Sequence, residues 1–313
     1  MAVKIGISAC VLGENVRFDG GHKASTFCTQ QLKPLVQYVA VCPEQAIGMG
    51  TPRPAIRLQR TADQQIRLVQ TRDNSLDYTS QMLEFTHGIM PRFAELSGYI
   101  VCAKSPTCGM ERVKLYAEDG TALGKMAIGM YTRELMQSYP WLPIEEDGRL
   151  LDPALKENFV SRVFACYDYQ QTMRDGFTIG KLVAFHSRYK FLVLAHSPVA
   201  YRQLGKLVAE AKLFTPAELQ LRYLTELMQA MRQIATRKQH ANVLQHLQGF
   251  FKKLMDNAAR QELTALIERY RLGRVPLLAP VTLLQHYLRL FPNQYLQQQV
   301  YFNPYPEQLG LRA

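Results

Sequence analysis

The chain has 313 residues, of which 47% are hydrophobic and 20% charged, and this composition excludes a disordered or low-complexity protein. It contains no run of 18 apolar residues and no secretory leader pattern at its start, so we expect no membrane segment and a cytoplasmic location. In that compartment the six cysteines are expected to be ligands, nucleophiles or core residues rather than disulfides.

The positive charge is concentrated in the second half of the chain. Residues 151–313 hold 21 Lys and Arg against 11 Asp and Glu, whereas residues 1–150 hold 16 against 15. The net charge of +11 therefore comes almost wholly from the second half. Clustered positive charge attracts polyanions such as nucleic acids through counterion release. A generic basic surface is the alternative interpretation.

The first half alternates short apolar strands with amphipathic stretches, which is typical of βα units. This pattern predicts an α/β fold, with a Rossmann-like first domain built on a mainly parallel sheet. The expected elements are strands at residues 4–9, 37–41, 98–101 and 113–116, a hairpin at 55–60 and 65–70, and helices at 76–96 (kinked or divided at Pro91) and 128–137.

Proline, glycine and acidic residues between Tyr139 and Gly148 break this pattern and predict a domain boundary near residue 150. Residues 1–150 should form the α/β domain. Residues 151–313 should form an all-α domain, because apolar residues recur there at helical spacing, with a less regular tail beyond Pro276. The expected helices are at residues 156–174, 178–196, 199–212, 216–236, 238–254 and 258–272.

Three cysteines, Cys10, Cys42 and Cys108, stand just beyond predicted strands. The carboxyl ends of neighbouring parallel strands converge on one crevice, where α/β folds bind their ligands. Three thiolates there can hold a metal ion or an iron–sulfur cluster and leave one coordination position open for a substrate. Any single cysteine taken alone is more often a buried core residue.

Five short motifs surround these cysteines. They are Ser-Ala-Cys-x-Leu-Gly at 8–13, Arg-Phe-Asp-Gly-x-x-Lys at 17–23, Val-Cys-Pro-Glu at 41–44, Pro-Arg-Pro at 52–54 and Lys-Ser-Pro-Thr-Cys-Gly at 104–109. In this order, over roughly the first 150 residues, they resemble the thiouracil desulfidase (TudS) family. The resemblance implies a 4Fe–4S cluster held by Cys10, Cys42 and Cys108, with the fourth iron free to bind the sulfur of a thiolated pyrimidine. Many relatives carry a further cysteine where this chain has Val16, which argues against an essential fourth cysteine ligand.

Glu44 and Ser105 are the candidates for proton handling, because they lie two and three residues from Cys42 and Cys108. A carboxylate near a cluster can exchange protons with a water nucleophile, and the family resemblance implies catalytic importance for both residues. A surface salt bridge for Glu44 and a helix N-cap for Ser105 are the alternatives. Candidates for ordering the loops or binding a substrate phosphate are Arg17, Asp19, Lys23 and Arg53.

The other three cysteines lie outside these five motifs. Cys102 lies in an apolar strand run and is interpreted as a core residue, with a ligand role as the lesser alternative. Cys28, in a segment rich in Ser and Thr, is either a reserve ligand or without a role. Cys166 lies in the helical half and is expected to be structural.

The second half resembles the YbgA-type helical domain, which occurs fused behind TudS-like domains. Basic residues are interleaved there with Tyr, Phe and His, a pattern suited to phosphate contact and base stacking. Amphipathic packing is the alternative for the aromatic residues. The candidate RNA-contacting residues are Arg188, Lys190, Arg202, Lys206, Lys252 and Lys253.

Fused proteins of this kind look like desulfidases that convert 4-thiouridine in tRNA to uridine and release sulfide. The expected partner is tRNA or a thiolated nucleotide, and the sequence does not indicate the oligomeric state. Three alternatives remain: a salvage enzyme for free thiouracil or thio-nucleotides, a non-enzymatic RNA-binding or redox-sensing protein, and a zinc hydrolase using the same three cysteines.

Overall fold

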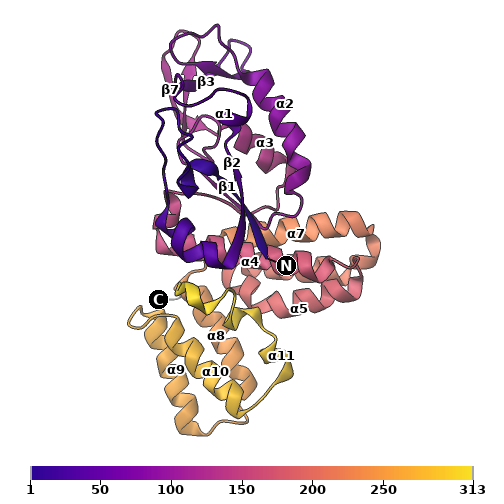
Figure 1. Cartoon of the computed structure of the whole chain (residues 1–313). Coiled ribbons are helices and arrows are strands. Elements are labelled where there is room, and N and C mark those ends of the chain that lie inside the picture. Colours follow the sequence, from indigo (N-terminus) through magenta and orange to yellow (C-terminus); the bar gives the residue numbers. More distant parts are fainter. Residues whose placement is uncertain (1, 312–313) are drawn as a thin grey trace. The chain divides into compact units, whose positions relative to one another are not determined.

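The structure, a computed structural model, describes residues 2–311 and divides the chain after Lys156 into two compact units (Figure 1). The first unit contains every β-strand of the described residues and the second is helical, which confirms the predicted fold class. Helix α4 (Pro153–Met173) begins just before the division and continues past it. No helix within residues 2–311 is both long and apolar enough to cross a membrane.

A four-stranded parallel sheet forms the centre of the first unit. Its order is β2 (Val36–Val41), β1 (Val3–Ser8), β5 (Gly98–Val101) and β8 (Ile144–Glu146). In β1, Ile5 and Ile7 on one face and Gly6 and Ser8 on the other are all buried, as expected for a central strand covered on both faces. A Cβ on Gly6 would lie 2.2 Å from the ring of Tyr99 on β5, so only glycine allows this packing.

A second sheet has the order β4-β3-β6-β7. The predicted hairpin is present, as β3 (Ile56–Arg60) pairs antiparallel with β4 (Ile66–Gln70). On its other side β3 pairs in parallel with β6 (Val113–Ala117), which pairs antiparallel with β7 (Ala122–Ala127). The long-range pairing of β3 with β6 was not predicted, because alternating hydrophobicity does not reveal a strand's partner.

Two helices of the first unit, α2 (Thr79–Ile89) and α3 (Met130–Ser138), pack against each other. Helix α2 is shorter than the predicted helix at residues 76–96. It gives way to a 3₁₀ turn at Met90–Phe93, because Pro91 has no amide proton to continue the helical hydrogen bonds.

The acidic segment that was predicted to break the fold instead belongs to the parallel sheet. Residues Ile144–Glu146 form β8, and Glu145, Glu146 and Asp147 are all buried. The Glu146 carboxylate accepts a hydrogen bond from the backbone N–H of Met110 at 2.9 Å, and Asp147 accepts one from Ala103 at 2.7 Å. Both acids thus fasten the loop that follows β5. Glu146 and Asp147 are buried because they bind backbone amides. A hydrophobicity pattern cannot predict such residues, since it assigns charged side chains to the surface.

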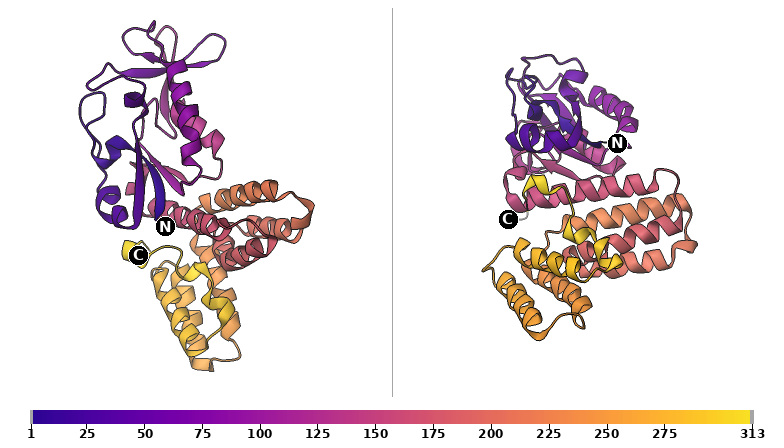
Figure 2. Two further views of the ribbon diagram at one scale, coloured as in Figure 1. Left: turned by 45° about the vertical axis from the view of Figure 1, so that its right-hand side comes forward. Right: turned by 60° about the horizontal axis from the view of Figure 1, so that its bottom comes forward.

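The second unit contains α5 (Ile179–His196), α6 (Pro198–Ala209), α7 (Pro216–Arg232), α8 (Arg237–Phe251), α9 (Asn257–Arg271), α10 (Leu278–Leu290) and α11 (Gln294–Gln297). Helix α5 contacts α6, α7 and α8, and α8, α9 and α10 pack on one another (Figure 2). The prediction of a less regular tail was wrong for α10. Pro280 lies in its first turn, where a missing N–H breaks no helical hydrogen bond.

Candidate active site

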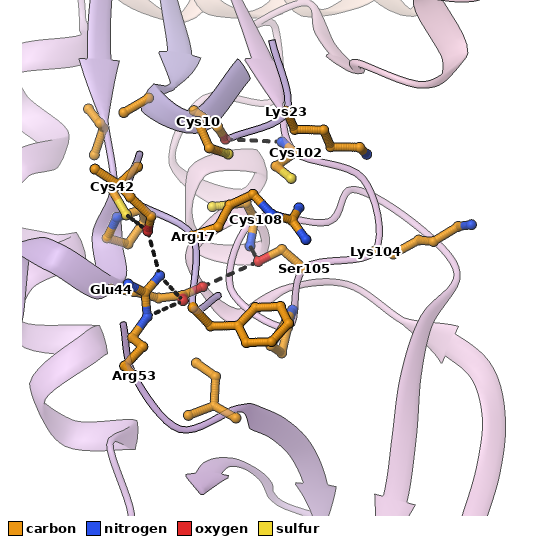
Figure 3. Close-up of a pocket in the computed structure, with 18 of the residues that line it drawn as sticks. Cys10, Arg17, Lys23, Cys42, Glu44, Arg53, Cys102, Lys104, Ser105 and Cys108 are labelled. Carbon is orange, nitrogen blue, oxygen red and sulfur yellow. Dashed lines mark hydrogen bonds and ion pairs between the residues drawn. The ribbon is translucent and has the colours of Figure 1, made fainter. Parts of the chain in front are cut away.

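A pocket of about 390 Å³ lies where β1, β2 and β5 end (Figure 3). Cys10 belongs to the 3₁₀ turn that follows β1, Cys42 comes directly after β2, and Cys108 lies in the loop that follows β5. All three line this pocket, and so does Cys102, which directly follows β5. The topology of the parallel sheet therefore brings together residues that are up to 98 positions apart in the sequence.

All six cysteines are free thiols, and those of the pocket differ in their surroundings. A hydrogen bond between the thiols of Cys10 and Cys102 raises the pKa of Cys10 and lowers the pKa of Cys102. Burial raises the pKa of Cys42 and of Cys108. Iron or another metal must therefore displace protons from these thiols when it binds.

Cys102 is the pocket residue whose position differs most from its sequence interpretation. It is 6% exposed, as a core residue would be, but it also lines the pocket beside Cys10. Within residues 2–311, no group of three His, Cys, Asp or Glu side chains is spaced to hold a single metal ion. Cys28 and Cys166 are buried and do not line this pocket.

Glu44 is held in the pocket by a nearly buried ion pair. The Nε and Nη2 atoms of Arg53 lie 2.9 and 2.5 Å from Oε2 of Glu44, and the Arg53 side chain is only 3% exposed. The remaining donors of Arg53 bind the carbonyls of Val16 and Gly50 and the hydroxyl of Thr51. With its donors engaged, Arg53 fits the predicted loop-ordering role and not that of a phosphate ligand.

The other carboxylate oxygen of Glu44 faces two hydroxyl groups. Thr107 Oγ1 donates a hydrogen bond to Oε1 at 2.5 Å, and Ser105 Oγ lies 3.4 Å from the same atom. Ser105 Oγ also accepts the backbone N–H groups of Thr107 and Cys108, at 3.2 and 3.1 Å. No helix begins at Ser105, so its hydroxyl caps a turn and the alternative of a helix N-cap was wrong, whereas its expected position near Glu44 is present in the structure.

Thr107 is a site residue that sequence reasoning missed. It is fully buried, and its hydroxyl lies between Glu44 and the Cys108 sulfur, 3.6 Å from the latter. Nothing distinguishes a threonine in a Pro-Thr-Cys turn from an ordinary loop residue. The available signals were its place in the motif at 104–109 and its position directly before a candidate ligand.

Arg17 and Lys23, the two remaining basic candidates of the first unit, each pair with a carboxylate. Lys23 lies 2.9 Å from Asp147, and Arg17 lies 3.4 Å from Asp19. Asp19 also accepts the backbone N–H of Gly21 at 3.1 Å, so it orders its own loop. Arg17 and Lys23 line the pocket, whereas Asp19 does not.

The six basic candidates of the second unit are not equivalent. Arg188 forms a two-pronged ion pair with Asp168, at 2.9 and 3.0 Å, and Lys206 lies 3.8 Å from Glu210. The other four form no ion pair with any side chain in the described part of the chain: Lys190, Arg202, Lys252 and Lys253. Those four are the better candidates for contact with a polyanion.

The aromatic residues near Arg188 have a structural role. Phe185, His186 and Tyr189 are at most 5% exposed. Phe185 stacks on Tyr189 with ring centroids 4.2 Å apart, and His186 hydrogen-bonds to the hydroxyl of Tyr223. The alternative of amphipathic packing therefore describes these residues, which are too buried to stack on a nucleic-acid base.

Comparison with known proteins assigns each half of the chain. Residues 5–147 match the family described as 2-thiouracil desulfurase, and residues 190–306 match a protein family of unknown function, DUF1722. Over 152 residues the chain is 38% identical to the uncharacterized protein YbgA of Escherichia coli (strain K12), covering 48% of this chain and 90% of YbgA. The 4Fe-4S-dependent thiouracil desulfidase TudS, a solved structure, is 27% identical with a TM-score of 0.38, covering 50% of this chain and 99% of TudS. The chain belongs to the family in which a TudS-like desulfidase domain is fused to a YbgA-type domain.

Proposed function

We propose that this protein is an iron–sulfur-dependent desulfidase that converts 4-thiouridine in tRNA to uridine and releases sulfide. The observation that carries the proposal is the pocket in which three strand-end cysteines meet Glu44 and Ser105. The match of residues 5–147 to the 2-thiouracil desulfurase family supports the same reaction class. The basic second unit supports RNA as the carrier of the thiolated base.

The donor set of the pocket fits a cluster held by Cys10, Cys42 and Cys108. Cysteine thiolates are the usual ligands of iron–sulfur clusters, and these three are free and line one pocket. A cluster of four irons spreads its ligands more widely than a single ion does, so its cysteines need not crowd around one point. When bound by three cysteines, it supplies one iron without a protein ligand, a Lewis acid suited to a soft thiocarbonyl sulfur.

The protein's own residues would handle the water and its proton. Arg53 occupies Oε2 of Glu44 and leaves Oε1 to accept a proton from a water that attacks C4 of the base. Ser105 and Thr107 both approach Oε1, so they orient the carboxylate and can position that water. Glu44 then returns this proton to the departing sulfur, which leaves as hydrosulfide, and the second proton of the water passes from the C4 hydroxyl to solvent as the carbonyl forms. The net reaction exchanges sulfur for the oxygen of water.

A base stacked within RNA cannot reach such a pocket, so the thiolated nucleotide must be unstacked first. Base-modifying enzymes generally take their target out of the stack at a cost of a few kcal/mol. Contacts to the phosphate backbone offset that cost, and the basic second unit would supply them. The test is to incubate the anaerobically reconstituted protein with thiolated tRNA, 4-thiouridine monophosphate and free 4-thiouracil, and to compare kcat/KM. The proposal predicts the highest value for tRNA, and the highest value for a small substrate would favour the salvage reaction.

Reversing the charge of Lys252 and Lys253 is expected to weaken tRNA binding. Both side chains are exposed just beyond α8, and neither has an acidic partner among the described residues. If both contact phosphates, the salt dependence of binding should become shallower, by about 1.5 in the slope of log K against log salt concentration. Filter binding at several salt concentrations measures this slope. Turnover of 4-thiouridine monophosphate, which needs only the pocket of the first unit, should be unchanged.

A matched control is reversal of Lys33 and Lys114, which are exposed in the first unit and change the net charge equally. The control should retain more of the tRNA affinity and the original slope. Equal losses in the two double variants would show a diffuse charge effect and remove the RNA-binding role from the second unit.

A further inference from the structure

Cys10 and Cys102 form a pair of neighbouring thiols in the pocket. The two side chains hydrogen-bond to each other and both line the pocket, where Figure 3 shows them side by side. Cys10 is one of the three proposed cluster ligands. Cys102 is not among them, and it has no place in the proton handling by Glu44. The pocket therefore holds one thiol more than a three-cysteine cluster site uses, directly beside one of its ligands.

The parallel sheet places these two cysteines at a separation that a disulfide can span. Strands β1 and β5 are neighbours, with Ile7 opposite Ile100. Just beyond that pair, the backbone N–H of Cys102 donates a hydrogen bond to Ser8 Oγ at 3.0 Å. Neighbouring strands lie about 4.8 Å apart, and a disulfide joins Cα atoms roughly 4.4–6.8 Å apart. The backbone spacing therefore allows a bond between Cys10 and Cys102 without a rearrangement of the sheet.

The other two cysteines of the pocket have different partners. Cys42 follows β2, on the far side of β1 from Cys102, and its thiol donates to the carbonyl of Val16 at 3.8 Å. The sulfur of Cys108 lies 3.6 Å from the hydroxyl of the preceding threonine. Oxidation of the pocket is therefore expected to join Cys10 to Cys102 rather than to Cys42 or Cys108.

We infer that Cys10 and Cys102 are a modification site, at which hydrogen peroxide converts the two thiols of the cluster-free protein into a reversible disulfide. One thiol attacks the peroxide: a sulfur–oxygen bond forms, the oxygen–oxygen bond breaks, and water and a sulfenic acid result. The second thiol attacks the sulfenic sulfur, so that the disulfide forms and a second water leaves. In total the two cysteines lose two electrons and two protons, and the peroxide is reduced to two waters.

The disulfide would protect a cluster ligand from permanent loss, a consequence that rests on the proposed function. While it lasts, Cys10 is withheld from iron, and a thiol reductant restores both thiols by exchange. Without Cys102 beside it, a sulfenic acid on Cys10 can react with further peroxide to give a sulfinic acid, which ordinary thiol reductants do not reverse. The pair therefore makes oxidation of the empty site reversible.

Peptide mapping tests the disulfide directly. The full-length protein would be freed of iron with a chelator, treated with an equimolar amount of hydrogen peroxide, alkylated and digested with trypsin. Cleavage leaves Cys10 alone in residues 5–17 and Cys102 alone in residues 93–104. We expect these two peptides to be cross-linked, the six free thiols to fall to four, and dithiothreitol to separate the peptides again. Six thiols that stay free, or a cross-link from Cys10 to Cys42 or Cys108, would overturn the inference.

Cys102→Ala tests the protective role, and Cys166→Ala is its matched control. Cys166 is fully buried and does not line the pocket, so its variant should form the same cross-link as the parent. In Cys102→Ala, excess peroxide should leave sulfinic acid on Cys10. After dithiothreitol and then iron and sulfide, this variant should take up about half or less of the iron that it binds when untreated, whereas the parent recovers fully. Equal recovery by Cys102→Ala and the parent would overturn the protective role.

The two measurements also separate this inference from the proposed function. The cross-linked peptides report on the thiol pair whether or not the protein binds a cluster. If the cross-link forms but the reduced, untreated protein takes up no iron, the modification site stands and the iron–sulfur function fails. If iron is taken up but peroxide never joins Cys10 to Cys102, the proposed function stands and the modification site is refuted.

Discussion

Replacing Cys10, Cys42 or Cys108 by alanine is expected to abolish desulfidase activity and to remove the visible absorbance of the anaerobically reconstituted protein. The three thiols line one pocket, but each is carried by the segment that follows a different strand. A change of rotamer in one cysteine therefore cannot replace the ligand lost at another. Loss of one thiolate from a three-cysteine site leaves two ligands, too few to retain the cluster. Absorbance spectra and iron analysis of each variant measure this loss.

Cys102→Ala is the most informative control, because Cys102 lines the same pocket and hydrogen-bonds to Cys10. If the ligands are assigned correctly, Cys102→Ala should keep its visible absorbance and iron content. Cys166→Ala, in a fully buried position of the second unit, should do the same. If Cys102→Ala loses its visible absorbance while any of the three ligand variants keeps it, the cluster ligands have been assigned to the wrong cysteines.

Replacing Glu44 by glutamine is expected to lower kcat about 10²- to 10⁴-fold while the cluster spectrum persists. The amide keeps the shape of the side chain but cannot accept the proton of the attacking water. It also leaves the buried charge of Arg53 without a counter-ion, so the free energy of unfolding should fall by about 3 kcal/mol. Single-turnover kinetics measure the first effect and urea denaturation the second.

Glu84→Gln, an exposed change on α2, provides the comparison for Glu44→Gln and should alter neither property. Thr107→Val separates orientation of Glu44 from its chemistry, because it removes the hydroxyl that bonds to Glu44, Ser105 and Cys108 and keeps the carboxylate. Its rate should fall less than that of Glu44→Gln. Normal turnover by a folded Glu44→Gln variant would leave Glu44 with a structural role only.

Much of the fold could be predicted because local pattern determined it. The strand Gly98–Val101 and the helix Ile179–His196 lie within a residue of their predicted bounds, since their hydrophobic spacing and end residues agree. Strand β8 could not be predicted, because its buried acids bind backbone amides of a distant loop. The pairing of β3 with β6 depends in the same way on contacts across the chain.

In the candidate site, too, local motifs could be predicted and long-range contacts could not. Motifs located Cys10, Glu44 and Ser105 because each lies beside a strand end, where a sheet places its ligands. They did not show that Arg53 is buried against Glu44, or that Arg188 is occupied by Asp168. Whether a basic side chain is available to a ligand depends on which acid folds against it, and sequence spacing carries little information on such pairs.

The most direct test of the central claim is a sulfur balance on thiolated tRNA. Cluster-loaded protein would be incubated anaerobically with tRNA that contains 4-thiouridine, and uridine, remaining 4-thiouridine and free sulfide would be quantified over time. The proposed function predicts one uridine and one sulfide for each 4-thiouridine lost, over many turnovers, and no loss with the Cys42→Ala variant. Unchanged 4-thiouridine with the loaded parent protein, or equal loss with the Cys42→Ala variant, would contradict it.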